Sequence, residues 1–523
     1  MSQKRAIVIG LDGMPPDLVR PLVDQGIMPT LQRFQSGGLL TTLESIIPPF
    51  TGPSWTSLTT GVNPGKHGMY AFVMPDRARR PKLMSSYDVG YPRIHEMLAL
   101  WGMRSVIINL PLSYPPRLLQ GLIISDWLHP ELLVIPRSLA GIAQGYVMPQ
   151  PPSLTSKGRD WARFLRDTTA RVTCLKRIFK GLDWDLFFVV FSETDWLMHL
   201  IYDNMLGGEM PDEVVSTLQT IDGFVRWVLD EMSSGSLLLL VSDHGFKKYR
   251  GFVHPNVALN SAGLARFALG SRDRSFMRSF GEHFQWRGWM APPVPIQIQT
   301  ILFHSEIARK LASKFVSKVL RLRRRWIPRV GWVVDPSSQA FMLDSQHVGI
   351  YLNSREVFDD GNMEPVDEQV QARIVELLAT LRSPSDGKRV IKKIYHRDEL
   401  FQGPYTRMFP HLILETSDDY VANNSILPKQ PVSGLSHFDH SMLGILGAIG
   451  RDVDADGALA RPSVLDITPT LLAYLGLPVP TDTDGQVLTS LLGHRVDLRN
   501  SDFDYLKEWR AIVKLRQVPA QIR

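Results

Sequence analysis

Cysteine is almost absent from this chain, which has one, Cys174, among 523 residues. A single cysteine excludes an intrachain disulfide and a cysteine-rich zinc site, and it fits a reducing compartment. Long apolar runs are also missing, since the longest candidates, Leu186–Phe191 and Leu237–Val241, are far shorter than the ~18 residues of a membrane span. Neither charge dominates, because 58 Lys and Arg stand against 52 Asp and Glu, so charge alone does not predict nucleic-acid binding.

The remaining composition is typical of a folded globular protein, with 44% hydrophobic and 21% charged residues. The N-terminus runs directly into the apolar stretch Ala6–Leu11 without a small-residue cleavage site. We therefore expect a first core strand there and not a signal peptide. Together with the low cysteine content, this predicts a cytoplasmic protein.

Short runs of aliphatic and β-branched residues recur along the chain and are apolar on both faces, as strands covered by helices on two sides are. Stretches with helical periodicity lie between several of them. Strands that alternate with helices predict an α/β domain with a mostly parallel sheet. The predicted strands are Ala6–Leu11, Ser105–Asn109, Gly121–Ser125, Asp185–Phe191, Ser236–Val241, His411–Leu414 and Met442–Ala448, and the predicted helices include Pro16–Gln25, Met28–Gln35, Ala162–Lys180 and Pro211–Glu231.

One region, from about Asn260 to Asp335, departs from this pattern because it is basic, aromatic and helical. Within it, Ile301–Arg325 is amphipathic with a strongly basic side. The favoured interpretation is a solvated helix in an inserted cap. The alternative is a surface that meets anionic lipid or an anionic substrate.

Acids and histidines follow three of the predicted strands, at the ends where open α/β sheets carry their functional groups. Asp12 follows the first strand, Asp195 and His199 follow the fourth, and Asp243 and His244 follow the fifth. The four-residue spacing of Asp195 and His199 puts both on one face of a helix. Each pair alone is more often structural, but three such strand ends together predict a site for Zn²⁺, Mn²⁺ or a similar ion.

A candidate nucleophile, Thr51, stands where a helix is expected to begin, since Pro53 is tolerated in a first turn and Ser54–Thr60 can continue it. A threonine there is most often a helix cap. The same position offers free N–H groups and the positive end of the helix dipole to a phosphoryl oxygen. A metal-bound hydroxyl there would lose its proton near neutral pH and attack phosphorus.

These residues belong to an ordered set of motifs that resembles the type I phosphodiesterase/nucleotide pyrophosphatase family of the alkaline phosphatase superfamily. The set covers about residues 5–255 and 340–490 and is highly specific in its order. Its parts are Ile7-Val-Ile-Gly-Leu-Asp-Gly-Met, Met28-Pro-Thr-Leu, Pro48-Pro-Phe-Thr-Gly-Pro-Ser-Trp, Thr60-Gly-Val-Asn-Pro-Gly-Lys-His-Gly, Asp195-x3-His199, Asp243-His-Gly, Tyr395-His-Arg-Asp-Glu-Leu-Phe, Val464-Leu-Asp-Ile-Thr-Pro-Thr and Asp484-Gly485.

The resemblance implies an alkaline phosphatase-like three-layer αβα sandwich with a mostly parallel central sheet and an inserted basic, helical cap. It also implies two divalent metal ions per chain, expected to be Zn²⁺, with Mn²⁺ as the alternative. One ion would be held by Asp12, Thr51, Asp243 and His244. The other would be held by Asp195, His199 and a late histidine, for which His440 is favoured and His437 is the alternative.

The activity that the resemblance implies is a metal-dependent phosphodiesterase in which Thr51 attacks phosphorus and a phosphothreonine is then hydrolysed. Nucleotide pyrophosphatases of the family carry an asparagine donor about twenty residues after the nucleophile, and Gly68–Met74 contains none. Nucleotide specificity is therefore not implied. The alternatives are a phosphomonoester or phosphonate hydrolase, a phosphotransferase, or a weakly catalytic protein that binds a phosphorylated ligand or a membrane surface.

The implied domain organisation divides the chain into three parts. Residues 1–255 and 340–495 are expected to form the catalytic domain, residues 256–339 the inserted cap, and residues 496–523 a helical tail. The expected partner is a small phosphoester or a lipid headgroup, without nucleic acid, and with peripheral membrane contact through the insertion left open.

Overall fold

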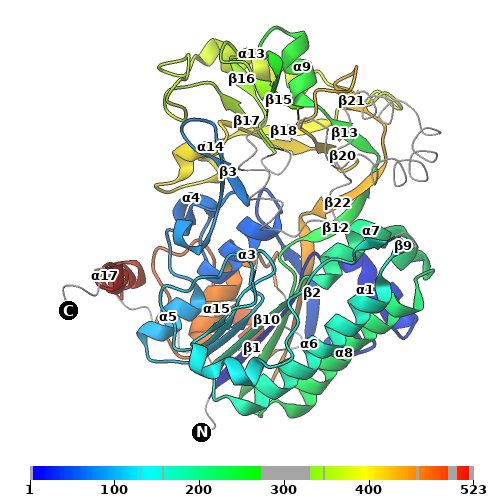
Figure 1. The fold of residues 1–523 in the computed structure, drawn as a ribbon, viewed down its shortest axis with the longest axis vertical. Coiled ribbons are helices and arrows are strands. Elements are labelled where there is room, and N and C mark those ends of the chain that lie inside the picture. The colour runs from blue at the N-terminus through cyan, green and yellow to red at the C-terminus, as the bar shows by residue number, and fades with distance from the viewer. Residues whose placement is uncertain are drawn as a thin grey trace.

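The computed structural model describes residues 4–129, 131–155, 158–271, 330–344, 348–454, 457, 459–492 and 503–517. They form a larger unit built on an eight-stranded sheet and a smaller unit placed above it (Figure 1). The sheet order is β2-β23-β11-β1-β10-β5-β6-β7. Its strands are β2 (Leu39–Glu44), β23 (Leu443–Gly450), β11 (Ser236–Val241), β1 (Arg5–Leu11), β10 (Leu186–Phe191), β5 (Ser105–Ile108), β6 (Gly121–Ile124) and β7 (Val134–Ile135).

The centre of this sheet is parallel, from β11 through β1, β10 and β5 to β6. β23 and β7 run against their neighbours. The apolar runs predicted as strands on both sides of the centre are confirmed, and Met442–Ala448 corresponds to the antiparallel strand β23. The predicted strand His411–Leu414 is also confirmed, as β19 (Leu412–Thr416), but it belongs to a separate sheet in the smaller unit.

Side chains of β1 alternate between two cores, as the period of two in a strand requires. Ile7, Ile9 and Leu11 pack in one core, and Ala6 and Val8 pack in the other. The first core lies under α1 (Pro16–Asp24), α2 (Thr30–Gly37), α6 (Trp161–Gly181), α7 (Glu193–Gly207) and α8 (Asp212–Glu231), and the second under α3 (Thr51–Thr60), α5 (Ile94–Leu100), α15 (Ile467–Tyr474) and α17 (Tyr505–Gln517). The result is a three-layer αβα sandwich.

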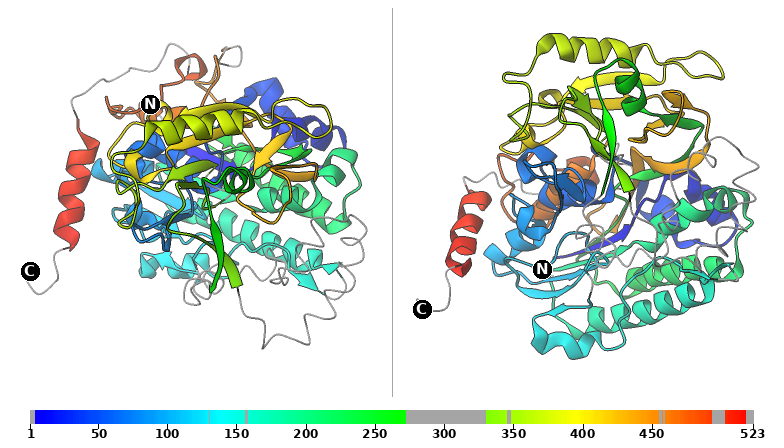
Figure 2. Two further views of the ribbon diagram at one scale, coloured as in Figure 1. Left: turned by 90° about the horizontal axis from the view of Figure 1, so that it is seen from above. Right: turned by 45° about the horizontal axis from the view of Figure 1, so that its top comes forward.

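The smaller unit has its own apolar core and its own sheets. It is joined to the larger unit by the ribbon β12–β22, which leaves the sheet beyond the end of β11 and returns into β23 (Figures 1 and 2). It therefore sits over the carboxyl ends of the parallel strands. Its elements are β12 (Gly245–Tyr249), β13 (Gly251–Val253), α9 (Pro255–Ser261), β16 (Ala340–Phe341), β17 (Gly349–Leu352), α13 (Glu368–Ala379), β18 (Ile391–His396), β19, β20 (Tyr420–Ala422), β21 (Val432–Ser433) and β22 (His437–Ser441).

Most of the predicted basic insertion, residues 272–329, lies outside the described residues, and on either side of it β14 (Phe267–Ser271) pairs with β15 (Val330–Val334). The division at residues 255 and 340 stays a prediction.

Within the described ranges, no helix is both long and apolar enough to cross a membrane. The remaining short elements are α4 (Pro64–His67), β3 (Val73–Pro75), β4 (Pro81–Leu83), β8 (Leu154–Thr155), β9 (Gly158–Arg159), α14 (Arg397–Leu400) and α16 (Thr489–Leu492).

Candidate active site

The three strands predicted to carry acids at their ends are neighbours in the sheet. β1 lies between β10 and β11, and Leu11 is level with Phe191, just as Gly10 is level with Val241. All three strands run in the same direction, so the residues that follow them meet at one edge. Asp12 follows β1 at that edge, α7 begins there after β10, and Asp243 follows β11.

Three of these residues form the first cluster: Asp12, Asp243 and His244, all buried. His244 Nε2 lies 3.7 Å from Asp12 Oδ1 and 3.5 Å from Asp243 Oδ2. The hydroxyl of Thr51 joins them, with its Oγ1 at 3.2 Å from the same nitrogen. The structure thus brings together the four residues predicted for one ion.

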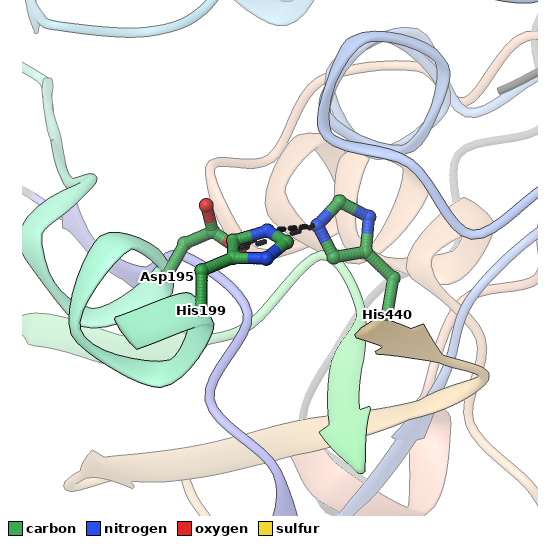
Figure 3. A group of neighbouring side chains, drawn as sticks. All are labelled: Asp195, His199 and His440. Atoms are coloured by element: carbon green, nitrogen blue, oxygen red, sulfur yellow. Dashed lines mark hydrogen bonds and ion pairs between the residues drawn. The ribbon is translucent and has the colours of Figure 1, made fainter. Parts of the chain in front are cut away.

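A second cluster combines Asp195 and His199 of α7 with His440 of β22 (Figure 3). The Nε2 atoms of the two histidines are 3.0 Å apart. Asp195 Oδ1 lies 3.5 Å from His199 Nε2 and 3.3 Å from His440 Nε2. The two clusters adjoin, because the His244 and His440 rings stack with 4.1 Å between their centroids.

His437, the alternative ligand, points away from the second cluster. In the ribbon, His440 is level with Phe246 and His437 is level with Tyr249, three positions away along the same strand. Side chains three apart on a strand lie on opposite faces. The His437 ring stacks on Phe252 with 3.6 Å between centroids, and its Nδ1 donates to the carbonyl of Leu435.

Thr51 is the first residue of α3, and Phe50, not Thr51, occupies the cap position. Every residue of α3 is buried, although most are polar. The helix accommodates this because its threonine hydroxyls donate to carbonyl oxygens one turn earlier, at 2.7–2.8 Å for Thr56, Thr59 and Thr60. At the start of α3, Pro53 has no N–H and the Ser54 N–H donates to Phe50, so the N–H groups of Thr51 and Gly52 are the ones left beside the Thr51 hydroxyl.

A close approach between α3 and β1 holds this helix over the sheet edge. Trp55 lies one turn after Thr51 and is fully buried. A Cβ at Gly10 would come within 2.4 Å of Trp55 Cη2, so only glycine leaves room for the indole. Gly10 is two residues before Asp12, so the contact places the nucleophile candidate beside the first-strand carboxylate.

The hydrogen bonds of His244 define which ring nitrogen carries the proton. Its Nδ1 lies 3.0 Å from the carbonyl oxygen of Gly245, which can only accept. Nδ1 therefore carries the hydrogen, and Nε2 presents a lone pair toward Thr51, Asp12 and Asp243.

The charges of the two clusters behave differently. Burial, followed by the charges of neighbouring carboxylates, raises the pKa of both Asp12 and Asp243 well above their usual range. Burial also acts on Asp195, but His199 and His440 outweigh it and hold the pKa of Asp195 at about 2. In return, Asp195 overcomes the burial of His440 and raises its pKa.

The donor atoms fit divalent cations. Asp12 Oδ1, Asp195 Oδ1 and Asp243 Oδ2 are buried and have no hydrogen-bond partner among the described residues. These are the oxygens that face the histidine nitrogens in the two clusters. An ion held tetrahedrally at about 2.0–2.1 Å from each ligand places its ligands roughly 3.3–3.4 Å apart, close to the separations seen here. Carboxylate and imidazole donors suit Zn²⁺ or Mn²⁺.

Apolar side chains border the residue that follows Thr51. A Cβ at Gly52 would lie 3.0 Å from Phe72 Cε1 and 3.4 Å from Leu112 Cδ1, so these side chains border the residue after Thr51. Phe72 lies within Gly68–Met74, the stretch without an asparagine. In the sequence, this stretch stands out for its missing asparagine, but no role was predicted for Phe72, and no motif pointed to Leu112.

The sheet order and the helical layers define an alkaline phosphatase-like fold. The sequence family that the chain matches makes it a hydrolase of phosphoric esters. The chain belongs to the type I phosphodiesterase / nucleotide pyrophosphatase family, whose sequence model matches residues 6–442. This confirms the resemblance predicted from the sequence motifs. No curated protein matches the chain.

Two solved structures illustrate the fold. Phosphonoacetate hydrolase from Sinorhizobium meliloti 1021, in complex with phosphonoformate, is 16% identical with a TM-score of 0.55, over 91% of this chain and 95% of that chain. Wild-type alkaline phosphatase PafA is 15% identical with a TM-score of 0.54, over 94% of this chain and 100% of that chain. At these identities the likeness establishes the fold, and the substrate remains to be inferred from the site.

Proposed function

We propose that the chain is a metal-dependent phosphodiesterase that uses Thr51 as its nucleophile and two divalent ions, Zn²⁺ or alternatively Mn²⁺. Asp12, Thr51, Asp243 and His244 would hold one ion, and Asp195, His199 and His440 the other. The observation that carries the proposal is that three buried carboxylate oxygens without hydrogen-bond partners among the described residues face histidine nitrogens at 3.3–3.7 Å.

When bound, the ions would supply the positive charge that lowers the pKa of the Thr51 hydroxyl and neutralises the phosphoryl oxygens. Thr51 Oγ1 forms a bond to phosphorus while the bond to the leaving alcohol breaks, and the hydroxyl proton ends on that alcohol. The phosphothreonine that results still carries the other organic group of the diester. Water then attacks phosphorus from the opposite side, breaks the bond to Thr51 and restores its hydroxyl. The N–H groups at the start of α3 bind a phosphoryl oxygen meanwhile.

A diester is favoured as substrate by family membership and by the apolar surroundings of Gly52. Phe72 and Leu112 offer no donor to an additional charged oxygen, whereas a diester has a second organic group that such side chains can contact. We expect a small phosphoester or a lipid headgroup as the substrate. A cytoplasmic location stays part of the proposal.

The test compares hydrolysis of bis-p-nitrophenyl phosphate, p-nitrophenyl phosphate and phosphonoacetate by the wild type, Thr51→Ala and Thr51→Ser, each with Zn²⁺ or Mn²⁺. We expect the diester to be the best substrate, with a loss on the order of 10³-fold or more in Thr51→Ala. Thr51→Ser keeps a hydroxyl and is expected to retain part of the activity.

The other outcomes each point to a different class. Faster turnover of the monoester would make the protein a phosphatase, and faster turnover of phosphonoacetate would make it a phosphonate hydrolase. Undiminished activity in Thr51→Ala would remove the nucleophile from the proposal. Two bound ions without turnover of any substrate would favour a binding protein for phosphorylated ligands.

A further inference from the structure

Asp195 and His199 both lie in the first two turns of α7. The helix starts without a capping side chain, since Ser192 occupies the cap position and makes no such hydrogen bond. After these turns the helix is interrupted at Ile201, which has φ −145° and ψ 29°. The interruption separates the first two turns from the rest of α7, so whatever holds the start of the helix sets the position of Asp195 and His199.

An ion pair buried beneath the first turn holds that start. Glu193, the first residue of α7, is fully buried and pairs with Arg171 of α6, which is 2% exposed. Arg171 also donates to the carbonyl oxygen of Val147 at 2.8 Å. Thr168 Oγ1 lies 3.3 Å from Glu193 Oε1 and 3.3 Å from an Arg171 nitrogen. Two side chains of α6, Arg171 and Thr168, therefore hold the same carboxylate oxygen of Glu193.

Stability alone gives no good reason for this pair. Glu193 Oε2 and Arg171 Nε are buried and have no hydrogen-bond partner in the described parts of the chain. A buried ion pair with incomplete hydrogen bonding loses much of its attraction to desolvation, and apolar replacements of similar volume are often neutral or stabilising. We infer that the pair instead fixes the position of the first turn of α7 relative to α6.

The next residue connects this anchor to the first cluster. Thr194 Oγ1 donates to the carbonyl oxygen of Asp12 at 2.6 Å. Ser192 is also held, because Asn109 Nδ2 lies 3.2 Å from its hydroxyl. The three residues just before Asp195 are thus each held by a different element. Ser192 is held at the end of β5, Glu193 by α6, and Thr194 by the residue after β1.

We propose that Arg171 and Glu193 are positioning residues that hold Asp195 and His199 in the geometry needed to bind a divalent cation. This inference rests on the proposed two-ion site. Neither residue touches the reacting atoms, and the pair acts only through the backbone of α7. Outer partners of metal ligands typically change metal affinity by about 10–100-fold when they are removed.

The test is a calorimetric titration of metal-free protein with Zn²⁺, comparing the wild type with the double variant Arg171→Met/Glu193→Leu. We expect two ions to bind in both proteins, one of them about 10–100-fold more weakly in the variant. The Tm of the metal-free variant is expected to be unchanged or higher. In a His440→Ala background, where only the first cluster remains complete, the double substitution should leave the remaining Kd unchanged.

The matched control is Lys180→Met/Glu231→Leu, which removes an exposed ion pair at the other end of α6. It should change neither Kd. Equal weakening of both sites, or no weakening, in the Arg171 and Glu193 variant would overturn the inference. If that variant does not fold, Arg171→Lys takes its place in the test, because a lysine keeps the charge but cannot reach both Glu193 and Val147. An unchanged Kd in Arg171→Lys would also overturn the inference. A wild type that binds fewer than two ions would instead contradict the proposed function.

Discussion

The two clusters are only a few ångströms apart, yet their charges are compensated in different ways. Asp12, Asp243 and His244 are at most 2% exposed and place two carboxylates beside one neutral imidazole. Asp195, His199 and His440 are 8–19% exposed and place one carboxylate between two imidazoles. The second cluster can neutralise itself by protonating His440. The first has two carboxylates and a neutral imidazole, so a proton on one carboxylate still leaves it with one negative charge.

This contrast shows that clusters of the same residue types can differ in how much they depend on a cation for charge compensation. In the first cluster, burial and mutual repulsion raise the carboxylate pKa values, so a cation relieves an unfavourable arrangement. In the second, the low pKa of Asp195 shows that the histidines already stabilise the carboxylate. A cation there has to replace an existing interaction, and we expect it to bind less tightly and exchange faster.

Removal of the metal ions is expected to have the largest effect. On dialysis against a chelator, we expect activity to disappear when the first of two ions leaves, and that ion should come from the more exposed second cluster. Each site saturated at about 100 times its Kd stabilises the fold by roughly 2.7 kcal/mol, so the Tm should drop in two steps. Metal content, Tm and activity measured at intervals during dialysis check this. Simultaneous release of both ions would remove the distinction between the clusters.

The second prediction separates the two late histidines. His440→Ala removes a donor from the second cluster, so we expect turnover of the diester to fall by about 100-fold or more and one ion to be lost. His437→Ala removes the stack with Phe252 and Tyr249 and the hydrogen bond to Leu435, on the other face of the ribbon, and we expect less than about a threefold change. Assays with metal analysis of both variants test this. Equal losses of turnover in the two variants would show that the structure of the ribbon, and not metal binding by His440, explains the effect.

The histidine pair also shows how far the sequence could lead. The motifs favour His440 and keep His437 as the alternative, because the choice depends on the register of β22 against β12, which brings His440 level with Phe246. By contrast, the meeting of Asp12, Asp195 and Asp243 could be predicted, since parallel strands end at one edge. Local apolar pattern and strand direction were enough to predict that these carboxylates meet. The choice between the two histidines was decided by pairing between segments almost 200 residues apart.

Contacts without a local pattern escaped prediction altogether. Glu193 stands in the same motif as Asp195, but its burial against Arg171 depends on how α6 packs on the sheet. The smaller unit was likewise not anticipated as a separate core, since its short strands resemble those of the main sheet in composition. Sequence reasoning thus reached residues at strand ends and missed those defined by helix packing.

The third prediction concerns stability without metal. We expect Asp243→Asn to raise the free energy of unfolding of the metal-free protein by about 1–3 kcal/mol, because the neutral amide avoids the cost of either burying the carboxylate or protonating it. Asp195→Asn should lower it by about 2 kcal/mol, because it removes the carboxylate that pairs with His199 and His440. Denaturant unfolding in the presence of chelator measures both. Changes of the same sign would contradict the difference in charge compensation.

The smallest effect is the pH dependence of these two changes in metal-free protein. In the unfolded chain, Asp243 loses its proton near its ordinary pKa of about 4. In the folded protein its pKa is raised, so it still holds the proton when the pH exceeds that value. Wild type therefore loses stability as pH rises above about 4, and the gain from Asp243→Asn should grow from pH 4.5 to pH 6. Asp195 has a lowered pKa of about 2, so its contribution is complete above about pH 4 and disappears as pH falls through 2.

The Asp195 carboxylate stays ionised over the same interval, but it also raises the pKa of His440. In Asp195→Asn that support is lost and burial favours neutral His440, so the unfolded chain binds more protons there than the folded variant does. The loss from Asp195→Asn should therefore shrink as pH rises from 4.5 to 6, and paired unfolding curves of wild type and each variant at pH 4.5, 5.2 and 6 measure both slopes. Saturating Zn²⁺ should abolish the slope for Asp243, since a bound cation keeps the carboxylate ionised in the folded state. A flat difference for Asp243→Asn would mean that Asp12 alone holds the proton in the first cluster, and the same series on Asp12→Asn would then show the slope.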